Sequence, residues 1–474
     1  MEIKVSSEIG TLRSLVIHSP DSGIGRVAPS KAQDWLFEDI LHLETVRKKE
    51  YDLYVKVLLY FLDPEIIRGR IAEIDSSESN RSFYKPNNRN FHNSLKVIEI
   101  ERLLSEILED NNICQKLTAA VCAIEGCSYK LQKELINTSP AELAKIFISG
   151  SLFDGSMIFP PIPNLIFTRD IGITINDYIL INKPAKKARS RETLLARYIF
   201  FNHKIFENYR DHILEIPDTV KYFLRPGEDP GEKTTIEGGD VMVVSPRHIL
   251  IGCSERTTLS GASEAIKLLF EHNVIEKVTL IKIPHKRDFM HIDTIFTQVK
   301  RDTWVVLGSI SSKEQHRGPD AIDYFSEKKN KEKPEIIQFK KGKMDRPKKF
   351  ACIEDLLDHI SRKDLGSETE TRFIYSGNNI FPFDVREQWT DSCNLLALKE
   401  GVVVGYDRND KTIEAFRENG FTTLTASDLI EKLEKNEITI ESLTDTLILI
   451  PSAELSRARG GFHCMSMPLL RDDI

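Results

Sequence analysis

The chain has 474 residues, of which 41% are hydrophobic and 29% are charged, and its formal net charge at pH 7 is −7. This length is sufficient for a large hydrophobic core, and the composition is typical of a soluble globular protein. The acidic balance argues against a nucleic-acid-binding surface as the main functional feature, so we expect no nucleic-acid partner.

Targeting signals and cysteine usage indicate the cellular compartment. The N-terminal residues lack a basic region followed by an apolar stretch, and no apolar stretch approaches membrane-spanning length. We therefore expect neither a signal peptide nor association with a membrane. The cysteines are odd in number and lack Cys-x-x-Cys spacing, which favours free thiols in a reducing cytoplasm over a disulfide framework or a zinc site. They are Cys114, Cys122, Cys127, Cys253, Cys352, Cys393 and Cys464.

The N-terminal third begins with a predicted strand and continues mainly as helix. Residues 11–18 have the pattern of a strand, and residues 35–62 carry apolar side chains at the helical spacing of three and four residues. Residues 75–94 are polar and aperiodic, which predicts a loop. From residue 95 to residue 149 helical patterns dominate.

The helical stretch has its own internal signals. Ser139 begins a capping box with Pro140 at the first helical position, so a new helix is expected to start there. We interpret residues 65–150 as an all-helical insertion between 1–64 and 151–474. Its clearest apolar stripe consists of Ile98, Ile100, Leu103, Leu104, Ile107 and Leu108.

After residue 160 the chain changes to short strand-like segments with helical patterns between some of them. This alternation indicates an α/β or α+β layered domain, although no fixed-period repeat defines its architecture. The chain then ends with a strand, helix and strand unit. The predicted strands are 171–175, 178–181, 241–244, 248–252, 277–283, 304–307, 402–404 and 447–450, and the predicted helices are 262–271 and 411–419.

A lysine-rich segment, residues 327–349, lies within a longer stretch at 311–371. An anionic partner would account for its charge, but a solvated surface excursion would do so equally. The interspersed acidic residues and the scarcity of aromatic residues favour the solvated surface.

Near the C-terminus, residues 460–468 place Cys464 beside His463 after two glycines. Glycines allow a close backbone approach or dihedral angles that a side chain forbids. A cysteine in this setting is a candidate nucleophile if an acid/base histidine and carboxylates lie elsewhere in the fold. The alternative is a buried cysteine that acts as a small hydrophobic residue.

Further polar clusters interrupt the apolar pattern at 164–170, at 237–240 and at 291–293. His291 and Asp293 are two residues apart, so on a strand both would project from one face, as a proton shuttle with its charge partner or as metal ligands. Taken singly, each cluster is also explained by a turn or a surface ion pair. Metal binding by His291, Asp293 and Glu237 is disfavoured, because metal sites usually recruit more than one histidine.

Taken together, these clusters resemble the arginine deiminases of the guanidine-modifying (amidinotransferase) superfamily. The resemblance implies a five-bladed, pseudo-symmetric α/β propeller, the pentein fold, with a helical insertion in the N-terminal third. Two departures stand out: Phe462 replaces a third glycine or small residue, affecting loop mobility or the pocket rim, and the chain is longer at 65–95 and 311–371. The motifs lie at 6–13, 29–30, 36–39, 167–170, 188–193, 237–242, 255–257, 290–294, 386–389, 401–409 and 459–468.

The resemblance also implies roles for individual residues. Cys464 matches the nucleophile and His291 the general acid/base, which leaves the neighbouring His463 as scaffold. Asp170 and Asp293 match the carboxylates that hold the guanidinium, and Glu237 matches the acid that pairs with the histidine. The residues matching the substrate-binding set are Asn164, Phe167, Arg189, Arg256 and, near the pocket mouth, Arg459.

The implied reaction is L-arginine plus water giving L-citrulline and ammonia through a cysteine thiouronium, with no metal or organic cofactor. Alternatives within the superfamily are an amidinotransferase and a deiminase for methylated or peptide-bound arginine. The alternative of another class is a catalytically silent homologue that binds arginine. A homo-oligomer is the default expectation for such a protein.

Overall fold

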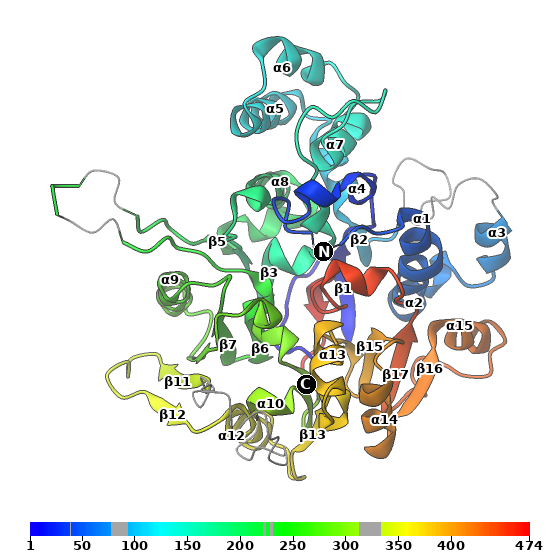
Figure 1. Ribbon diagram of the computed structural model, residues 1–474, viewed down its shortest axis with the longest axis vertical. Coiled ribbons are helices and arrows are strands. Elements are labelled where there is room, and N and C mark those ends of the chain that lie inside the picture. Colours follow the sequence, from blue (N-terminus) through cyan, green and yellow to red (C-terminus); the bar gives the residue numbers. More distant parts are fainter. Residues whose placement is uncertain (38, 77–92, 221–223, 228–230, 312–332) are drawn as a thin grey trace.

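The computed structural model describes residues 1–37, 39–76, 93–220, 224–227, 231–311 and 333–474. Most of the loop predicted at 75–94, and the start of the lysine-rich segment, lie outside these residues. The described chain has a mixed α/β fold, in which helices lie outside a set of small sheets (Figure 1). None of its helices is long and apolar enough to cross a membrane.

The described strands form five separate sheets. Within each sheet the strands are given in spatial order. The first sheet contains β18 (Met467–Arg471), β1 (Leu12–Ile17) and β2 (Val97–Glu99), and the second contains β3 (Gly172–Ile175), β4 (Tyr178–Ile181) and β5 (Ile213–Glu215). The third contains β12 (Lys348–Phe350), β11 (Glu335–Lys340), β8 (Lys277–Lys282), β7 (His248–Cys253) and β6 (Val241–Ser245); the fourth contains β13 (Arg372–Tyr375), β10 (Thr303–Val306) and β9 (Phe296–Lys300); and the fifth contains β14 (Leu396–Lys399), β15 (Val402–Tyr406), β17 (Thr446–Ile450) and β16 (Thr422–Thr425).

All five sheets contain the same three-strand unit. Two strands pair antiparallel, and the second of them pairs parallel with a third strand that follows a helical connection. A parallel partner requires such a crossover, whereas an antiparallel one needs only a tight turn. The connections differ in length and content, which explains why no fixed-period repeat is visible in the sequence. Their helices include α8 (Ser190–Asn202), α9 (Leu259–Glu271), α12 (Ile353–His359), α14 (Asp410–Glu418) and α15 (Ala426–Glu434).

The strands and helices predicted after residue 160 are confirmed within a few residues at their ends. Helix α14 ends where predicted, because Gly420 adopts φ +84°, a left-handed conformation that terminates helices. The lysine-rich segment is only partly a solvated excursion. Its described part contains the hairpin of β11 and β12, which extends the sheet beyond β8.

The helical N-terminal third differs from the prediction in two places. Residues 35–37 and 39–42 are not α-helical, and α1 (Leu43–Thr45) continues through a π-helical stretch into α2 (Asp52–Leu62). Residues 97–99 form the buried strand β2 rather than helix, because they pair with β1. Figure 1 shows α5–α7 projecting from one end of the molecule. The remaining helices are α3 (Ile71–Ser76), α4 (Ile100–Ile107), α5 (Asn111–Glu125), α6 (Tyr129–Ile136), α7 (Pro140–Ser149), α10 (Gly308–Ser311) and α13 (Phe383–Trp389).

The segment before β18 is anchored by an aromatic residue. Phe462 is fully buried, and its ring lies 4.7 Å from that of Tyr54 on α2 and 4.8 Å from that of Tyr406 on β15. The sequence suggested an effect of Phe462 on loop mobility or on the pocket rim, and its burial away from the pocket lining favours the effect on the loop. Phe462 fixes the loop that carries Cys464 to the core.

Candidate active site

The chain segments that lead into the first strand of each three-strand unit converge on one site. They carry Asp170 before β3, Glu237 before β6, His291 before β9, Asn394 before β14 and Cys464 before β18. In three of the five the segment is a single 3-10 turn: Thr168–Asp170, Gly238–Asp240 and Ile292–Thr294. Equivalent positions of a repeated unit thus supply chemically different side chains.

Hydrogen bonds connect these five segments in order and return to the first. Arg169 N–H donates to the Cys464 carbonyl (3.0 Å), and Gly239 N–H donates to Asp170 Oδ1 (3.3 Å). Ile292 N–H donates to Asp240 Oδ1 (3.1 Å). The Asn394 amide completes the series, since its Nδ2 donates to the Asp293 carbonyl (3.4 Å) and its Oδ1 accepts from Cys464 N–H (3.0 Å).

The thiol of Cys464 is buried between an acceptor and a donor. Its Sγ–H donates to Asp293 Oδ2 at 3.3 Å, and Asn394 Nδ2 donates to Sγ at 3.2 Å. Burial, followed by the charges of Asp293, Asp170 and Asp391, raises the pKa of the Cys464 thiol well above its usual range. The free site therefore holds a thiol rather than a thiolate.

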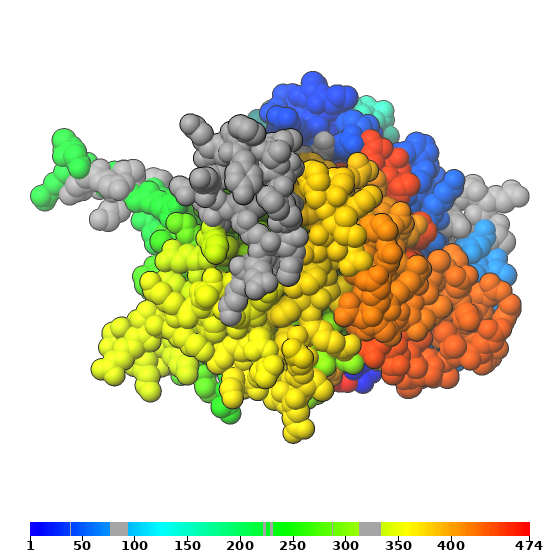
Figure 2. Space-filling model, turned by 60° about the horizontal axis from the view of Figure 1, so that its bottom comes forward, coloured from blue at the N-terminus to red at the C-terminus, as the bar shows by residue number. Residues whose placement is uncertain are grey.

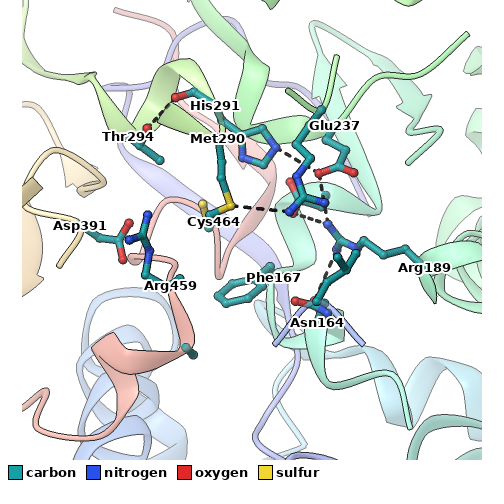
Figure 3. A pocket seen from close by; sticks show the side chains of 14 residues that line it. Asn164, Phe167, Arg189, Glu237, Met290, His291, Thr294, Asp391, Arg459 and Cys464 are labelled. Atoms are coloured by element: carbon teal, nitrogen blue, oxygen red, sulfur yellow. Dashed lines mark hydrogen bonds and ion pairs between the residues drawn. The ribbon is translucent and has the colours of Figure 1, made fainter. Parts of the chain in front are cut away.

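His291 is paired with Glu237, as the resemblance implies. Its Nε2 lies 3.1 Å from Glu237 Oε2, and both residues are buried (Figure 3). Burial opposes the charged imidazole, but the hydrogen bond to Glu237 and the charges of Asp170 and Asp240 outweigh it and raise the pKa of His291 to about 10. Gly239 permits this packing, because a Cβ there would lie 2.4 Å from His291 Nδ1.

The predicted strand geometry of His291 and Asp293 is wrong. Ile292–Thr294 form a 3-10 turn, so the two side chains have different partners instead of sharing a strand face. Asp293 lies behind Cys464, fully buried, and its Oδ2 also accepts from Nδ1 of His463 at 2.8 Å. Nε2 of His463 lies 2.6 Å from Arg169. His463 is thus held within a buried charge network. Oδ1 of Asp293 has no hydrogen-bond partner among the described residues.

Arg189 lines the pocket and is surrounded by carboxylates of the protein. Its Nη1 donates to Asp170 Oδ2 at 2.7 Å and lies 3.5 Å from Glu237 Oε2, while Glu192 binds the other edge of the guanidinium at 2.8 Å. Arg189 is therefore neutralised by protein carboxylates. Arg189 is paired with Asp170, whereas Arg256, the second arginine predicted to bind substrate, has a different environment.

Arg256 is a buried cation that forms no ion pair among the described residues. Its guanidinium donates a 3.7 Å hydrogen bond to the sulfur of Met290, and its Nε has no hydrogen-bond partner in the described chain. Its charge helps to lower the pKa of Glu237, but no carboxylate of the described chain contacts it directly. A buried charge without a direct partner is costly, so this position favours an anionic ligand group. Asn164 lines the same pocket and donates through Nδ2 to the Trp35 carbonyl at 2.8 Å.

The opposite wall carries Arg459, whose guanidinium lies 3.4 Å from the centre of the Trp389 ring. Asp391 lies beside it (Figure 3), and burial, partly offset by Arg459, raises the pKa of Asp391 to about 7. Asp391, Arg459 and Leu36 all have positive φ, between 57° and 62°. Such strained residues often occur at ligand sites.

The cavity measures about 30 Å³, so an amino acid enters only after lining side chains move.

Two sets of side chains have the donor spacing of a metal site. They are His291, Asp293 and Cys464, and Asp170, Glu237 and His291, and the donor atoms of each set lie within 4.8 Å of one another. Both sets depend on His291. An imidazole with a pKa near 10 is protonated at neutral pH and offers no lone pair, so the arrangement favours acid–base chemistry at His291 over metal ligation.

Comparison with known proteins agrees with the motifs. A family model described as arginine deiminase matches residues 33–471. The chain belongs to the arginine deiminase family. This confirms the family resemblance predicted from the sequence.

Two relatives of the arginine deiminase family match along their whole length. The arginine deiminase of Clostridium perfringens (strain SM101 / Type A) is 31% identical over 488 aligned residues, and that of Borrelia garinii subsp. bavariensis is 30% identical over 474. Each alignment covers 100% of this chain and 98% of the relative. Among solved structures, an amidinotransferase from Microseira wollei in a saxitoxin biosynthetic pathway has 13% identity and a TM-score of 0.45, with 100% of this chain and 98% of that one covered.

Of the ten residues predicted for this arginine deiminase site, all but Asp293 line the pocket, and Asp293 lies directly behind it. Asn394 and Asp391 were missed. Both follow the 386–389 motif closely, so their place beside a family motif was the one available signal. Nothing local in the sequence reveals that Asn394 contacts Cys464, since 70 residues separate them.

The raised pKa of the nucleophile predicts slow alkylation. In the free enzyme, labelling of Cys464 by iodoacetamide should increase only above about pH 9, because the thiolate is the reactive form. Asp293→Asn removes a negative charge that raises this pKa, so it should accelerate labelling at pH 8. Asp445→Asn is the control, because Asp445 does not line the pocket. Peptide mass spectrometry measures the rate, and equal rates in Asp293→Asn and wild type would contradict the assignment.

Proposed function

We propose that this protein hydrolyses free L-arginine to L-citrulline and ammonia through a covalent thiouronium on Cys464. The charge pattern of the pocket carries the proposal. Carboxylates of Asp170 and Asp293 lie beside the thiol, and the buried, unpaired Arg256 lines the same cavity. Free arginine has the complementary groups, a cationic guanidinium at one end and a carboxylate at the other.

Binding of the guanidinium prepares the nucleophile. The same carboxylates that raise the pKa of Cys464 accept hydrogen bonds from the substrate cation, which offsets their charge and favours loss of the thiol proton to water. Oδ1 of Asp293 is available for this contact. Asp170 already accepts from Arg189 and Gly239, but each carboxylate oxygen can accept more than one hydrogen bond.

The thiolate then attacks the central guanidinium carbon and the bond to one terminal nitrogen breaks. His291 is charged in the free site, so it donates a proton to this nitrogen, which leaves as ammonia. Because Glu237 engages Nε2, Nδ1 is the nitrogen that exchanges this proton. The neutral imidazole next takes a proton from water, and hydroxide adds to the thiouronium carbon. The carbon–sulfur bond then breaks and the proton of the added hydroxyl passes to the departing sulfur, which gives citrulline and the free thiol.

The proposal assigns Arg189 a supporting role. Its contacts to Asp170, Glu192 and Glu237 hold two site carboxylates in place, whereas Arg256 and Asn164 receive the α-carboxylate. Phe167 and Arg459 close the pocket on either side of the cysteine loop. Only glycine fits at position 460 against Phe167, because a Cβ there would lie 2.2 Å from the ring.

We also propose that the five three-strand units are the five blades of a propeller around this site. The continuous series of hydrogen bonds among the five leading segments supports this arrangement. Residues 1–64 and 151–474 then form one domain. The helical insertion at 65–150 is interrupted by β2, which belongs to the first blade.

The test is product formation from arginine in a buffer without an amine acceptor. We expect citrulline and ammonia in equal amounts. An amidinotransferase would require an added amine, and a deiminase for modified arginine would prefer methylated or peptide-bound substrate in a parallel panel. Arginine binding without either product would identify a silent homologue and contradict the proposal.

Recognition of the α-carboxylate by Arg256 gives a separate prediction. Arg256→Leu should lower kcat/KM for L-arginine about 100-fold, because a buried charge-assisted contact is lost. The decarboxylated analogue lacks that carboxylate, so its turnover should change by less than about threefold. Steady-state kinetics with both substrates measures the difference. An equal loss with both would place Arg256 away from the carboxylate.

A further inference from the structure

A basic cavity lies at the end of the five-stranded sheet, on chain segments other than those that form the arginine pocket. It measures about 380 Å³ and is lined by Arg247 of the β6–β7 turn, Lys277 at the start of β8, Lys340 at the end of β11, and Lys363 and Asp364 of the π-helical stretch Ile360–Asp364 after α12. The yellow part of the chain, which includes β11, β12 and α12, covers much of the face shown in Figure 2. Lys340 and Lys363 belong to the extra length at 311–371.

The strand register places several cations on one face of this sheet. Lys277 pairs with His248 of β7 on one side and with Lys340 of β11 on the other. Lys348 of β12 pairs with Gln338, which is two residues from Lys340 and therefore on the same face. Like charges directly opposite each other destabilise a sheet, so the fold retains Lys277 opposite Lys340 at a cost.

The floor of the cavity is built from buried polar side chains. The ammonium of Lys277 donates to Asp364 Oδ1, and Asp364 Oδ2 lies 2.7 Å from Nδ1 of His248. Burial lowers the pKa of His248 to about 4, so the ring is neutral and donates from Nδ1. Its Nε2 then accepts from Thr279 Oγ1 at 2.8 Å. This chain of hydrogen bonds fixes Lys277 with only 14% of its side chain exposed.

Positive charge at the cavity exceeds negative charge. Arg247, Lys277, Lys340 and Lys363 face two acids, Glu276 and Asp364. Asp364 forms an ion pair with Lys277, and Glu276 lies 3.8 Å from Arg247. Lys340 and Lys363 form no ion pair among the described residues. Burial and then the charges of Lys277 and Lys340 lower the pKa of the neighbouring Lys348. The chain as a whole is acidic, so this local excess is not a general property of its surface.

We propose that this cavity binds a small phosphate-bearing anion. Several converging ammonium and guanidinium groups around a fixed lysine suit a compact polyvalent anion. The volume falls within the range of small-molecule sites, about 300–1,000 Å³, and acids at the cavity disfavour an extended polyanion such as a nucleic acid. The site would give the lysine-rich segment a binding function distinct from the chemistry at Cys464, and it does not depend on the proposed reaction.

The experiment titrates the full-length protein with pyrophosphate by isothermal calorimetry, at an ionic strength held constant with sodium chloride. Lys340→Gln/Lys363→Gln removes two cavity cations. Lys343→Gln/Lys349→Gln is the matched control, because it removes the same charge from the same segment, and Lys349 pairs with Ile337 on the other face of the hairpin. Inorganic phosphate and a short DNA duplex are titrated in parallel.

We expect pyrophosphate to bind the wild type and the control variant equally, and the cavity variant roughly tenfold more weakly. Inorganic phosphate should bind more weakly than pyrophosphate, since it carries less charge. Absence of pyrophosphate binding to wild type, equal loss in both variants, or tighter binding of DNA than of pyrophosphate would each overturn the proposal. Arginine turnover should be the same in all three proteins, which separates this result from a failure of the proposed reaction.

Discussion

Replacing Cys464 by alanine should reduce citrulline formation from arginine by at least about 10⁴-fold while changing arginine affinity by less than about threefold. In the proposed mechanism the thiol forms the covalent bond, so its loss removes the pathway rather than slowing one step. The carboxylates of Asp170 and Asp293 and the guanidinium of Arg256, to which the proposal assigns substrate binding, stay in place. Single-turnover kinetics and equilibrium binding measure the two effects separately.

A matched cysteine variant distinguishes chemistry from packing. Cys352 is also buried but lies outside the pocket, so Cys352→Ala should retain wild-type turnover and lose only stability. Residual activity of Cys464→Ala above a few per cent of wild type would mean that water attacks arginine directly in this site, and would contradict covalent catalysis.

The two histidines near the thiol should differ sharply when each is replaced. His291→Ala should reduce kcat by about 10²–10⁴-fold, the usual contribution of general acid–base catalysis. His463→Ala should retain far more activity, although His463 is the sequence neighbour of Cys464. Its two ring nitrogens are occupied by Asp293 and Arg169, so no ring nitrogen is left for proton transfer to the substrate.

The cost of losing His463 should fall on stability instead. Its removal leaves Asp293 with only the thiol of Cys464 as a side-chain partner, whereas Arg169 keeps its buried ion pair with Glu8 at 2.6 Å. Loss of the charged partner of a buried carboxylate costs about 3–5 kcal/mol. Thermal unfolding of both variants, with His463→Gln as the conservative replacement, measures this. A larger loss of kcat in His463→Ala than in His291→Ala, with both proteins folded at the assay temperature, would reverse the assignment.

Local patterns predicted the strands that are long or strongly apolar, such as β7 and β17, and the start of α7 at Pro140. They missed short strands such as β2 and β5, each three residues long. Three residues carry no periodicity of their own, and they are extended only because a neighbouring strand supplies hydrogen bonds. The π-helical continuation of α12 was likewise not predicted.

The pocket-lining residues could be predicted from the family motifs, and so could the pairing of His291 with Glu237, but the other contacts could not. Asp293 was expected beside His291 on a strand, yet the 3-10 turn directs it to Cys464 and His463. The ion pair of Arg189 with Asp170 was not expected from the motifs. The contacts of Asp293 join residues 171 and 170 positions apart, and that of Arg189 joins residues 19 apart. All three are fixed by tertiary packing rather than by local sequence.

The covalent intermediate is the central claim, and trapping it tests that claim most directly. Acid quenching of the wild type during turnover of arginine should capture the intermediate, whereas His291→Ala, which lacks both the acid for departure of ammonia and the base that activates water, should form it more slowly. Peptide mass spectrometry should then find Cys464 heavier by the mass of arginine less ammonia, and the other cysteines unmodified. An enzyme that turns over arginine but carries no adduct on Cys464, in the wild type or in this variant, would contradict the mechanism.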